Sequence, residues 1–226
     1  MKFYIEKKKL LVISDMLYDG HTISKLNLGL LTYFAKSVFD VSVWVPSLDG
    51  HIDVNKLKEV LKKVDVVPSD LLLLVNKIKK LKPDLIFYPE IGMSSLVYSL
   101  AHYRLAPIQF TSWGHPETTG IKNIDYFISS NNIESKDAEQ HYSEKLIKLS
   151  QLPSVYSHIK FNENLTTHIE EFTPEGKYIT CLQSIYKFHP EFDAIICDIL
   201  KQNPTIKLYI IESSSHELLM RRFKNN

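Results

Sequence analysis

Short runs of β-branched and leucine residues alternate along this chain with longer segments whose apolar residues recur every three or four positions. The first run is Lys9–Ser14 (KLLVIS), helical spacing follows over 22–37, and Val41–Val45 (VSVWV) is the next run. This alternation predicts strands joined by crossover helices in a mostly parallel sheet. The chain is therefore constrained to the α/β class, with a doubly wound, Rossmann-like sheet whose loops carry function at one edge.

The same pattern continues to about residue 154 and then restarts. Further helices are predicted over 53–63, 69–81 (with Ser69 as N-cap) and 94–103, and further strands over 84–89, 107–112 and 125–129. About five parallel strands thus form an N-terminal Rossmann-like domain, residues 1–154. Residues 155–176 are polar, irregular in period and end in Pro-Glu-Gly, which is typical of a linker.

The segment 177–226 predicts the first part of a second Rossmann-like domain. It contains an expected strand, helix, strand and final helix, over 178–182, 190–202, 207–212 and from about 216. A crossover unit takes roughly 30 residues and a doubly wound domain needs several, so we expect this domain to be truncated. An incomplete sheet leaves an unpaired edge, which predicts association through the C-terminal strands.

Charge and composition exclude several function classes. The formal net charge is +1 and the lysine runs Lys7–Lys9 and Lys77–Lys80 adjoin apolar segments, which favours solvated faces over nucleic-acid contacts. Cys181 and Cys197 have neither metal-ligand nor disulfide-framework spacing. The apolar run after the N-terminal lysines is four residues, too short for a signal peptide or a membrane span. We expect a cytoplasmic protein with no nucleic-acid, membrane or metal partner.

Three loops follow predicted strands at the edge where such sheets bind ligands, and each contains glycine and hydroxyl residues. They are SDMLYDGHTISK (14–25), PEIGMSS (89–95) and SWGHPETTG (112–120). Glycine permits close backbone approach and hydroxyl residues can cap the next helix, so these loops are suited to anions and sugars. None matches a dinucleotide fingerprint or a P-loop, which disfavours a nicotinamide enzyme and a phosphate-cradle ATPase.

Two side chains at these edges could carry chemistry. His21 precedes a helix and suits proton transfer or hydrogen bonding to a sugar or phosphate, although a capping or surface histidine is the simpler interpretation. Lys187 follows the first strand of the second series and could neutralise a departing diphosphate, although most lysines are solvated surface groups. His115 by itself fits a structural role in its turn.

Together these segments resemble the catalytic region of the O-linked N-acetylglucosamine transferase family, including its bacterial relatives. The similar stretches are DGHTISKLNLGLL, PDLIFYPEIGM, RLAPIQFTSWGHPETTGIKNIDYFISS, AEQHYSEKLIKL and CLQSIYKFHPEFDAII, in the order of the family. The resemblance implies a GT-B architecture, two Rossmann-like domains across a cleft, and metal-independent, inverting transfer from a UDP-sugar without a cofactor. The implied donor is UDP-N-acetylglucosamine or UDP-glucose, and the implied acceptor is a protein.

The resemblance also implies roles for individual residues. His21 resembles the active-site histidine of the first domain, and Lys187 resembles the lysine that contacts the diphosphate. Gln183 is similar to a nucleotide-contacting glutamine. The loop WGHPETTG is expected to line the cleft. The substrate-binding candidates in the loops are Gly92, Gly114, His115, Thr118 and Thr119.

The chain departs from the family pattern at both ends. No tetratricopeptide repeats precede residue 9, and the glycine- and threonine-rich segment of the second domain has no counterpart before Asn226. The sequence therefore leaves three functions open: an active glycosyltransferase, an inactive truncated remnant with weak UDP-sugar binding, and a UDP-sugar epimerase, to which nothing in the loops points.

Overall fold

The computed structural model describes residues 7–18, 21–37, 39–46, 57–59, 61–156, 176–211, 217 and 221–222. The chain divides into two compact units, Met1–His158 and Ile159–Asn226. The expected linker 155–176 lies almost wholly outside the described residues, so the predicted domain boundaries stay a prediction. In the described part of the chain, every helix is too short or too polar to cross a membrane.

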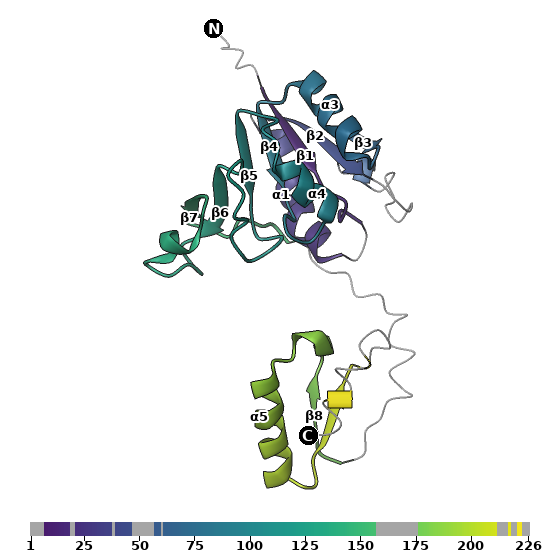
Figure 1. Cartoon of the computed structure of the whole chain (residues 1–226), viewed down its shortest axis with the longest axis vertical. Helices are drawn as coiled ribbons and strands as arrows, with labels where there is room; N and C mark the ends of the chain where they lie inside the picture. The colour runs from purple at the N-terminus through teal and green to yellow at the C-terminus, as the bar shows by residue number, and fades with distance from the viewer. Residues whose placement is uncertain are drawn as a thin grey trace. The chain divides into compact units, whose positions relative to one another are not determined.

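A parallel sheet forms the centre of the first unit (Figure 1). Its described strands are β1 (Lys8–Ile13), β2 (Phe39–Pro46), β3 (Val64–Val67), β4 (Leu85–Tyr88), β5 (Ile108–Thr111), β6 (Tyr126–Ser130) and β7 (Lys145–Leu149). They lie in the order β3-β2-β1-β4-β5-β6-β7 and every neighbouring pair is parallel. The predicted doubly wound sheet is confirmed, and its strand order reverses between β1 and β4.

Two strands of this sheet were not predicted, and both lie at an edge. The residues of β3 alternate between buried ends and an exposed centre, and β7 carries a lysine at two of its five positions. A short edge strand needs no continuous apolar run, so its sequence carries little strand signal. The helix predicted over 53–63 is observed only at 57–59, since residues 61–63 are not helical and the remainder lies outside the described residues.

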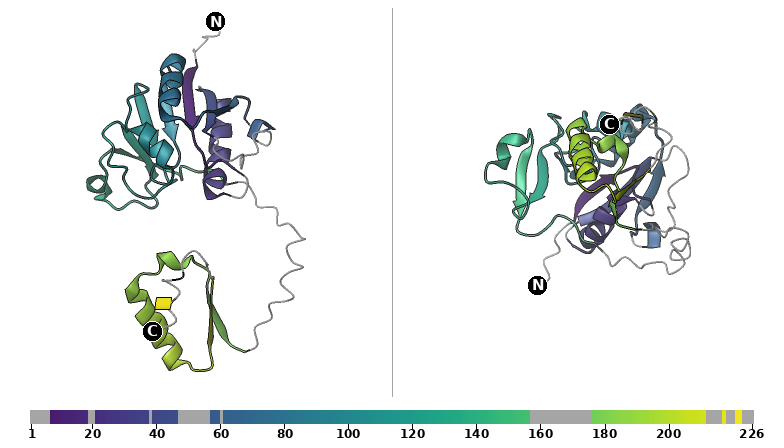
Figure 2. Two further views of the ribbon diagram at one scale, coloured as in Figure 1. Left: turned by 45° about the vertical axis from the view of Figure 1, so that its right-hand side comes forward. Right: turned by 90° about the horizontal axis from the view of Figure 1, so that it is seen from below.

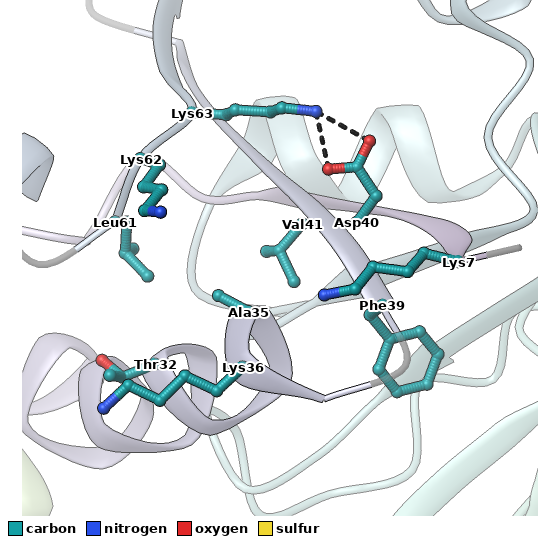
Figure 3. Close-up of a pocket in the computed structure, with 10 residues that line it drawn as sticks. All are labelled: Lys7, Thr32, Ala35, Lys36, Phe39, Asp40, Val41, Leu61, Lys62 and Lys63. Atoms are coloured by element: carbon teal, nitrogen blue, oxygen red, sulfur yellow. Dashed lines mark hydrogen bonds and ion pairs between the residues drawn. The ribbon is translucent and has the colours of Figure 1, made fainter. Parts of the chain in front are cut away.

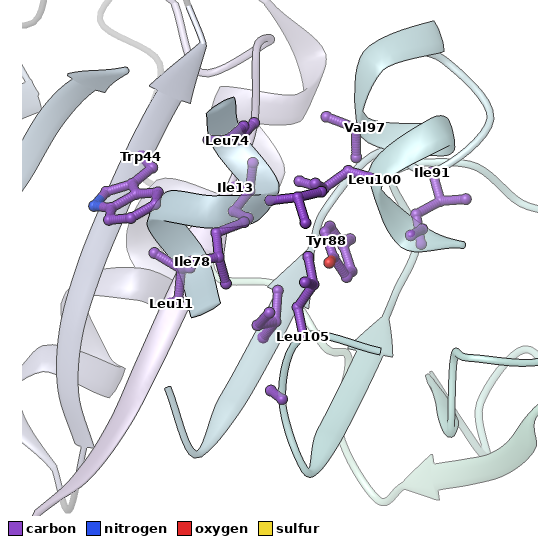
Figure 4. Close-up of a cluster of buried hydrophobic side chains, with 14 of the residues drawn as sticks. Leu11, Ile13, Trp44, Leu74, Ile78, Tyr88, Ile91, Val97, Leu100 and Leu105 are labelled. Atoms are coloured by element: carbon purple, nitrogen blue, oxygen red, sulfur yellow. The ribbon is translucent and has the colours of Figure 1, made fainter. Parts of the chain in front are cut away.

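Alternation along β1 places side chains on both faces of the sheet. Leu10 and Val12 pack in one buried cluster, and Leu11 and Ile13 pack in another. The first cluster includes residues of α1 (Thr22–Lys36). The second includes residues of α3 (Leu71–Leu81) and α4 (Ser95–Ala101) and is drawn in Figure 4. Because both faces are covered by helices, function is left to the loops at the strand ends.

The helix caps explain where the helices of the second cluster begin. Asp70, and not the predicted Ser69, is the N-cap of α3, because its carboxylate accepts a hydrogen bond from the N–H of Leu73 at 2.8 Å. Ser94 caps α4 in the same way through the N–H of Val97, at 3.1 Å. α3 ends at Lys82, whose φ of 51° stops the helix before Pro83.

The second unit contains β8 (Tyr178–Cys181), the 3₁₀ turn η3 (Ile185–Lys187), α5 (Pro190–Gln202) and β9 (Lys207–Ile210). The two strands pair in parallel, and α5 lies beside them in the views of Figure 2. This is the predicted strand–helix–strand series. A guanidinium–carboxylate pair ties its ends together, because Arg222 lies 2.9 Å from the buried carboxylate of Asp193 on α5.

Candidate functional site

The loops after β1 and β4 meet at the point where the strand order reverses. Ser14 and Asp15 follow β1, and Glu90 and Ser94 lie between β4 and α4. The backbone N–H of Asp15 donates to Oε1 of Glu90 at 3.0 Å, and the hydroxyl of Ser94 donates to Oδ2 of Asp15 at 2.5 Å. Open α/β sheets bind ligands at this switch point, outside the carboxyl ends of the strands.

Glu90 is completely buried in this cluster. Burial and the negative charge of Asp15 raise its pKa well above the usual carboxyl range, and hydrogen bonds from Ser14 and from the Asp15 N–H oppose this only in part. A carboxyl group in such surroundings holds its proton at neutral pH. The edge of the sheet therefore carries two carboxyl groups in different states.

His21 stands beside this cluster as the N-cap of α1. Its Nδ1 accepts a hydrogen bond from the N–H of Ile23 at 3.2 Å, and its ring lies 4.7 Å from the ring of Tyr18. Partial burial lowers the pKa of His21, while the negative charge of Asp15 opposes that shift. Since Nδ1 is the acceptor, the proton of the neutral imidazole lies on Nε2, which leaves an N–H donor for a ligand.

The loop after β5 packs directly on the loop after β4. A Cβ on Gly114 would lie 1.5 Å from the carbonyl oxygen of Pro89, so only glycine fits there. The ring of His115 lies against Gly92, whose φ is 99°. The structure thus gives these three predicted residues a packing role at the site's edge, and their predicted contact with substrate stays a prediction.

Thr118 and Thr119 are engaged by a carboxylate of their own unit. The hydroxyl of Thr118 donates to Oε2 of Glu144 at 2.7 Å, and the N–H and hydroxyl of Thr119 both donate to Oε1. Burial alone would raise the pKa of Glu144, but the hydrogen bonds from the two threonines outweigh it and lower that pKa. These hydroxyls hold the loop to the segment before β7, and whether they also contact a sugar stays a prediction.

The candidates of the second unit lie between β8 and α5. Gln183 is exposed and its Oε1 accepts a hydrogen bond from the N–H of Ser184 at 3.0 Å. Lys187 is exposed in η3, three residues before the first residue of α5. His189 caps α5 through its Nδ1, as His21 caps α1, although here the contact is 3.4 Å long. The placement of Lys187 before a helix N-terminus suits an anion.

Sequence reasoning singled out His21 but not the carboxyl groups beside it. Asp15 and Glu90 each come one or two positions after a buried apolar strand, and this was the signal that could have found them. Among the described residues, no group of three or more His, Cys, Asp or Glu side chains is placed to hold a metal ion.

A hollow of about 510 Å³ lies at the opposite edge of the sheet (Figure 3). It is lined by four lysines, and one of them, Lys63, pairs with Asp40 through contacts of 2.6 and 2.7 Å. Its walls come from the residue before β1, the start of β2, the end of α1 and the residues before β3. None of the predicted site residues lines it.

The chain is similar in sequence to known protein glycosyltransferases, although no family model matches it. It is 31% identical over 113 residues to the Arabidopsis thaliana protein named "Probable UDP-N-acetylglucosamine–peptide N-acetylglucosaminyltransferase SEC", covering 47% of this chain and 12% of that protein. It is 24% identical over 191 residues to the UDP-glucose:protein N-beta-glucosyltransferase of Actinobacillus pleuropneumoniae, covering 82% of this chain and 30% of that protein. The chain thus spans less than a third of the length of these relatives.

A solved structure shares the fold. A mutant of the Thermobaculum terrenum O-GlcNAc transferase aligns with 98% of this chain and 42% of its own, with a TM-score of 0.73 and 18% sequence identity. The fold is therefore GT-B-like, with a doubly wound Rossmann-like domain followed by a strand–helix–strand unit of a second one. These similarities confirm the predicted resemblance to the O-linked N-acetylglucosamine transferases and to glycosyltransferases more widely.

Proposed function

We propose that this protein is a UDP-sugar-dependent glycosyltransferase that modifies a protein, without a metal ion and with inversion at the anomeric carbon. The observation that carries the proposal is His21, a half-buried imidazole at the β1/β4 switch point with its Nε2–H left to face a ligand. The sequence similarity to two kinds of protein glycosyltransferase supports the same reaction class.

In this proposal His21 orients a substrate and does not remove a proton. Accepting a proton at Nε2 would require the proton of the ring to move to Nδ1, where it would break the hydrogen bond from Ile23. A fixed N–H donor instead holds a sugar or acceptor oxygen in a reactive orientation, which is a large part of what such an enzyme must supply.

Lys187 supplies the second role, charge neutralisation of the leaving group. As the acceptor atom bonds to the anomeric carbon, the bond from that carbon to the diphosphate oxygen breaks and UDP leaves with the electron pair. An ammonium group at the start of α5, together with the positive end of that helix, stabilises the developing negative charge. Gln183 is proposed to contact the nucleotide.

Either UDP-N-acetylglucosamine or UDP-glucose fits this description, because the two curated relatives are named for different sugars. The direct experiment incubates the purified full chain with each UDP-sugar and a mixture of candidate acceptor proteins, with and without EDTA. We expect a hexose or N-acetylhexosamine mass increment on an acceptor, retained in EDTA. UDP-sugar binding with no transfer and no hydrolysis would contradict the activity and leave a donor-binding protein.

A further inference from the structure

Glu90 is a buried acid with no cation to balance it. Its side chain is fully buried, and its hydrogen-bonding groups are the Ser14 hydroxyl, the Asp15 N–H and the Asp15 carboxyl. In the described part of the chain, no lysine, arginine or histidine forms an ion pair with it. An ionised carboxylate in this setting would be costly, since burial penalises an unpaired charge.

The geometry of the pair leaves room for one proton between the two acids. Oε2 of Glu90 and Oδ1 of Asp15 are both buried and have no other partner, yet the two carboxyl groups hydrogen bond to each other. Two ionised carboxylates have no hydrogen to share, so one of them must be protonated. Asp15 is less buried and accepts the short hydrogen bond from Ser94, which stabilises its anion, and Glu90 therefore keeps the proton.

We propose that Glu90 and Asp15 form a carboxyl pair sharing a single proton, and that this pair is a positioning element which holds Asp15 as the negative charge beside His21. The proton sharing stands on the structure alone. The positioning role rests on the proposed function, because it matters only if His21 acts on a substrate.

The location of the pair supports a role beyond packing. It lies at the strand-order switch, and an apolar side chain at position 90 would avoid the cost of burying a carboxyl group. Titratable groups driven into different protonation states by their surroundings are typical of functional sites. The other titratable side chains placed against this set are Tyr18, which stacks near His21, and His115, whose ring meets Gly92 two residues after Glu90.

Carbon-detected NMR on the full chain with labelled Glu and Asp carboxyl carbons tests the shared proton directly. We expect the Glu90 carboxyl carbon to keep its protonated chemical shift at pH 7. A Glu90 carboxyl that titrates with an ordinary midpoint of about 4.3 would overturn the proposal. This measurement needs no donor, acceptor or turnover.

Variants of the two acids test the effect on His21, read from the pH titration of its ring nitrogens. Asp15→Asn removes the charge and is expected to lower the His21 midpoint by about one pH unit. Glu90→Gln keeps a donor to Asp15 and is expected to leave that midpoint unchanged, whereas Glu90→Leu shifts it. Asp84→Asn, a carboxylate that accepts a hydrogen bond from Lys9 at the opposite end of the sheet, is the matched control. An unchanged His21 midpoint in Asp15→Asn would refute the positioning role.

Transfer assays separate this proposal from the proposed function. Glu90→Leu is expected to lower turnover about tenfold at unchanged UDP affinity, with partial rescue in Glu90→Gln. Equal turnover in wild type and Glu90→Leu would contradict the positioning role. If the wild-type chain transfers no sugar, the proposed function fails, and the NMR titrations still decide whether the proton is shared.

Discussion

Nδ1 of His21 accepts the backbone N–H of Ile23 at 3.2 Å, so the residue proposed to hold the substrate is also the N-cap of α1. The cap fixes the ring's orientation and its tautomer together, because a protonated Nδ1 could not accept that hydrogen bond. Burial lowers the pKa of His21 in the same direction, so the imidazole is held neutral with its donor outward.

Replacing His21 separates its two roles. Asparagine is among the best N-cap residues, so His21→Asn is expected to keep the stability of α1, whereas His21→Ala should cost about 1 kcal/mol in urea unfolding. Both variants should lose sugar transfer, because neither places an imidazole N–H at the switch point. Transfer at the wild-type rate in His21→Asn would show that the imidazole only caps the helix.

A methyl group at Gly114 should displace the loop that closes the site. The Cβ of Gly114→Ala would lie 1.5 Å from the Pro89 carbonyl oxygen, so we expect a loss of about 1–3 kcal/mol in thermal or urea unfolding. Gly120→Asn is the control, since a Cβ at Gly120 meets nothing within 4 Å and asparagine tolerates its φ of 67°. Equal effects of the two substitutions would contradict the packing role of Gly114.

The chain after β7 depends on a second glycine contact. A Cβ on Gly29 of α1 would lie 2.2 Å from the carbonyl oxygen of Val155. Although alanine favours a helix over glycine, Gly29→Ala is expected to release the segment around Val155 from α1, seen as faster amide hydrogen exchange at 152–156. Unchanged exchange there, with higher stability, would mean that the segment does not rest on α1 in solution.

The second unit should depend on Arg222 far more than on its neighbour. Asp193 is 3% exposed and accepts hydrogen bonds from Arg222, which also donates to the carbonyl of Phe188. Arg222→Ala is expected to destabilise this unit by about 2–3 kcal/mol, below the range for fully buried pairs because Arg222 is partly exposed. Arg221→Ala, which removes an exposed pair with Glu217, should cost less than about 0.5 kcal/mol. Similar losses in both would contradict this account.

Glu90 should also give the protein a recognisable pH dependence. Because its pKa is raised in the folded state, the native form keeps a proton that the unfolded chain releases above about pH 4.3. Its contribution to stability is present below that pH and is lost as the pH rises toward the folded pKa. The stability difference between Glu90→Gln and wild type, from urea unfolding at several pH values, should therefore shift in favour of the variant as pH rises. A constant difference from pH 5 to 8 would contradict the raised pKa.

The sheet's interior strands and long helices could be predicted from the sequence, because burial on both faces writes continuous apolar runs such as Leu10–Ile13 into it. The edge strands β3 and β7 could not, since half of their side chains face solvent. The position of His21 followed from its place between a strand and a helix. The partners of Thr118 and Thr119 did not, because Glu144 is 25 residues or more away in sequence and only the fold brings them together.

Binding of UDP is the most direct measurement of the central claim, that this fold holds a nucleotide's diphosphate through Lys187. Calorimetric titration of the full chain with UDP should give saturable binding, weakened about tenfold or more in Lys187→Ala. Lys201→Ala, at the opposite end of α5, should bind as wild type does. No detectable binding by the wild-type chain, or equal affinities for all three proteins, would contradict it.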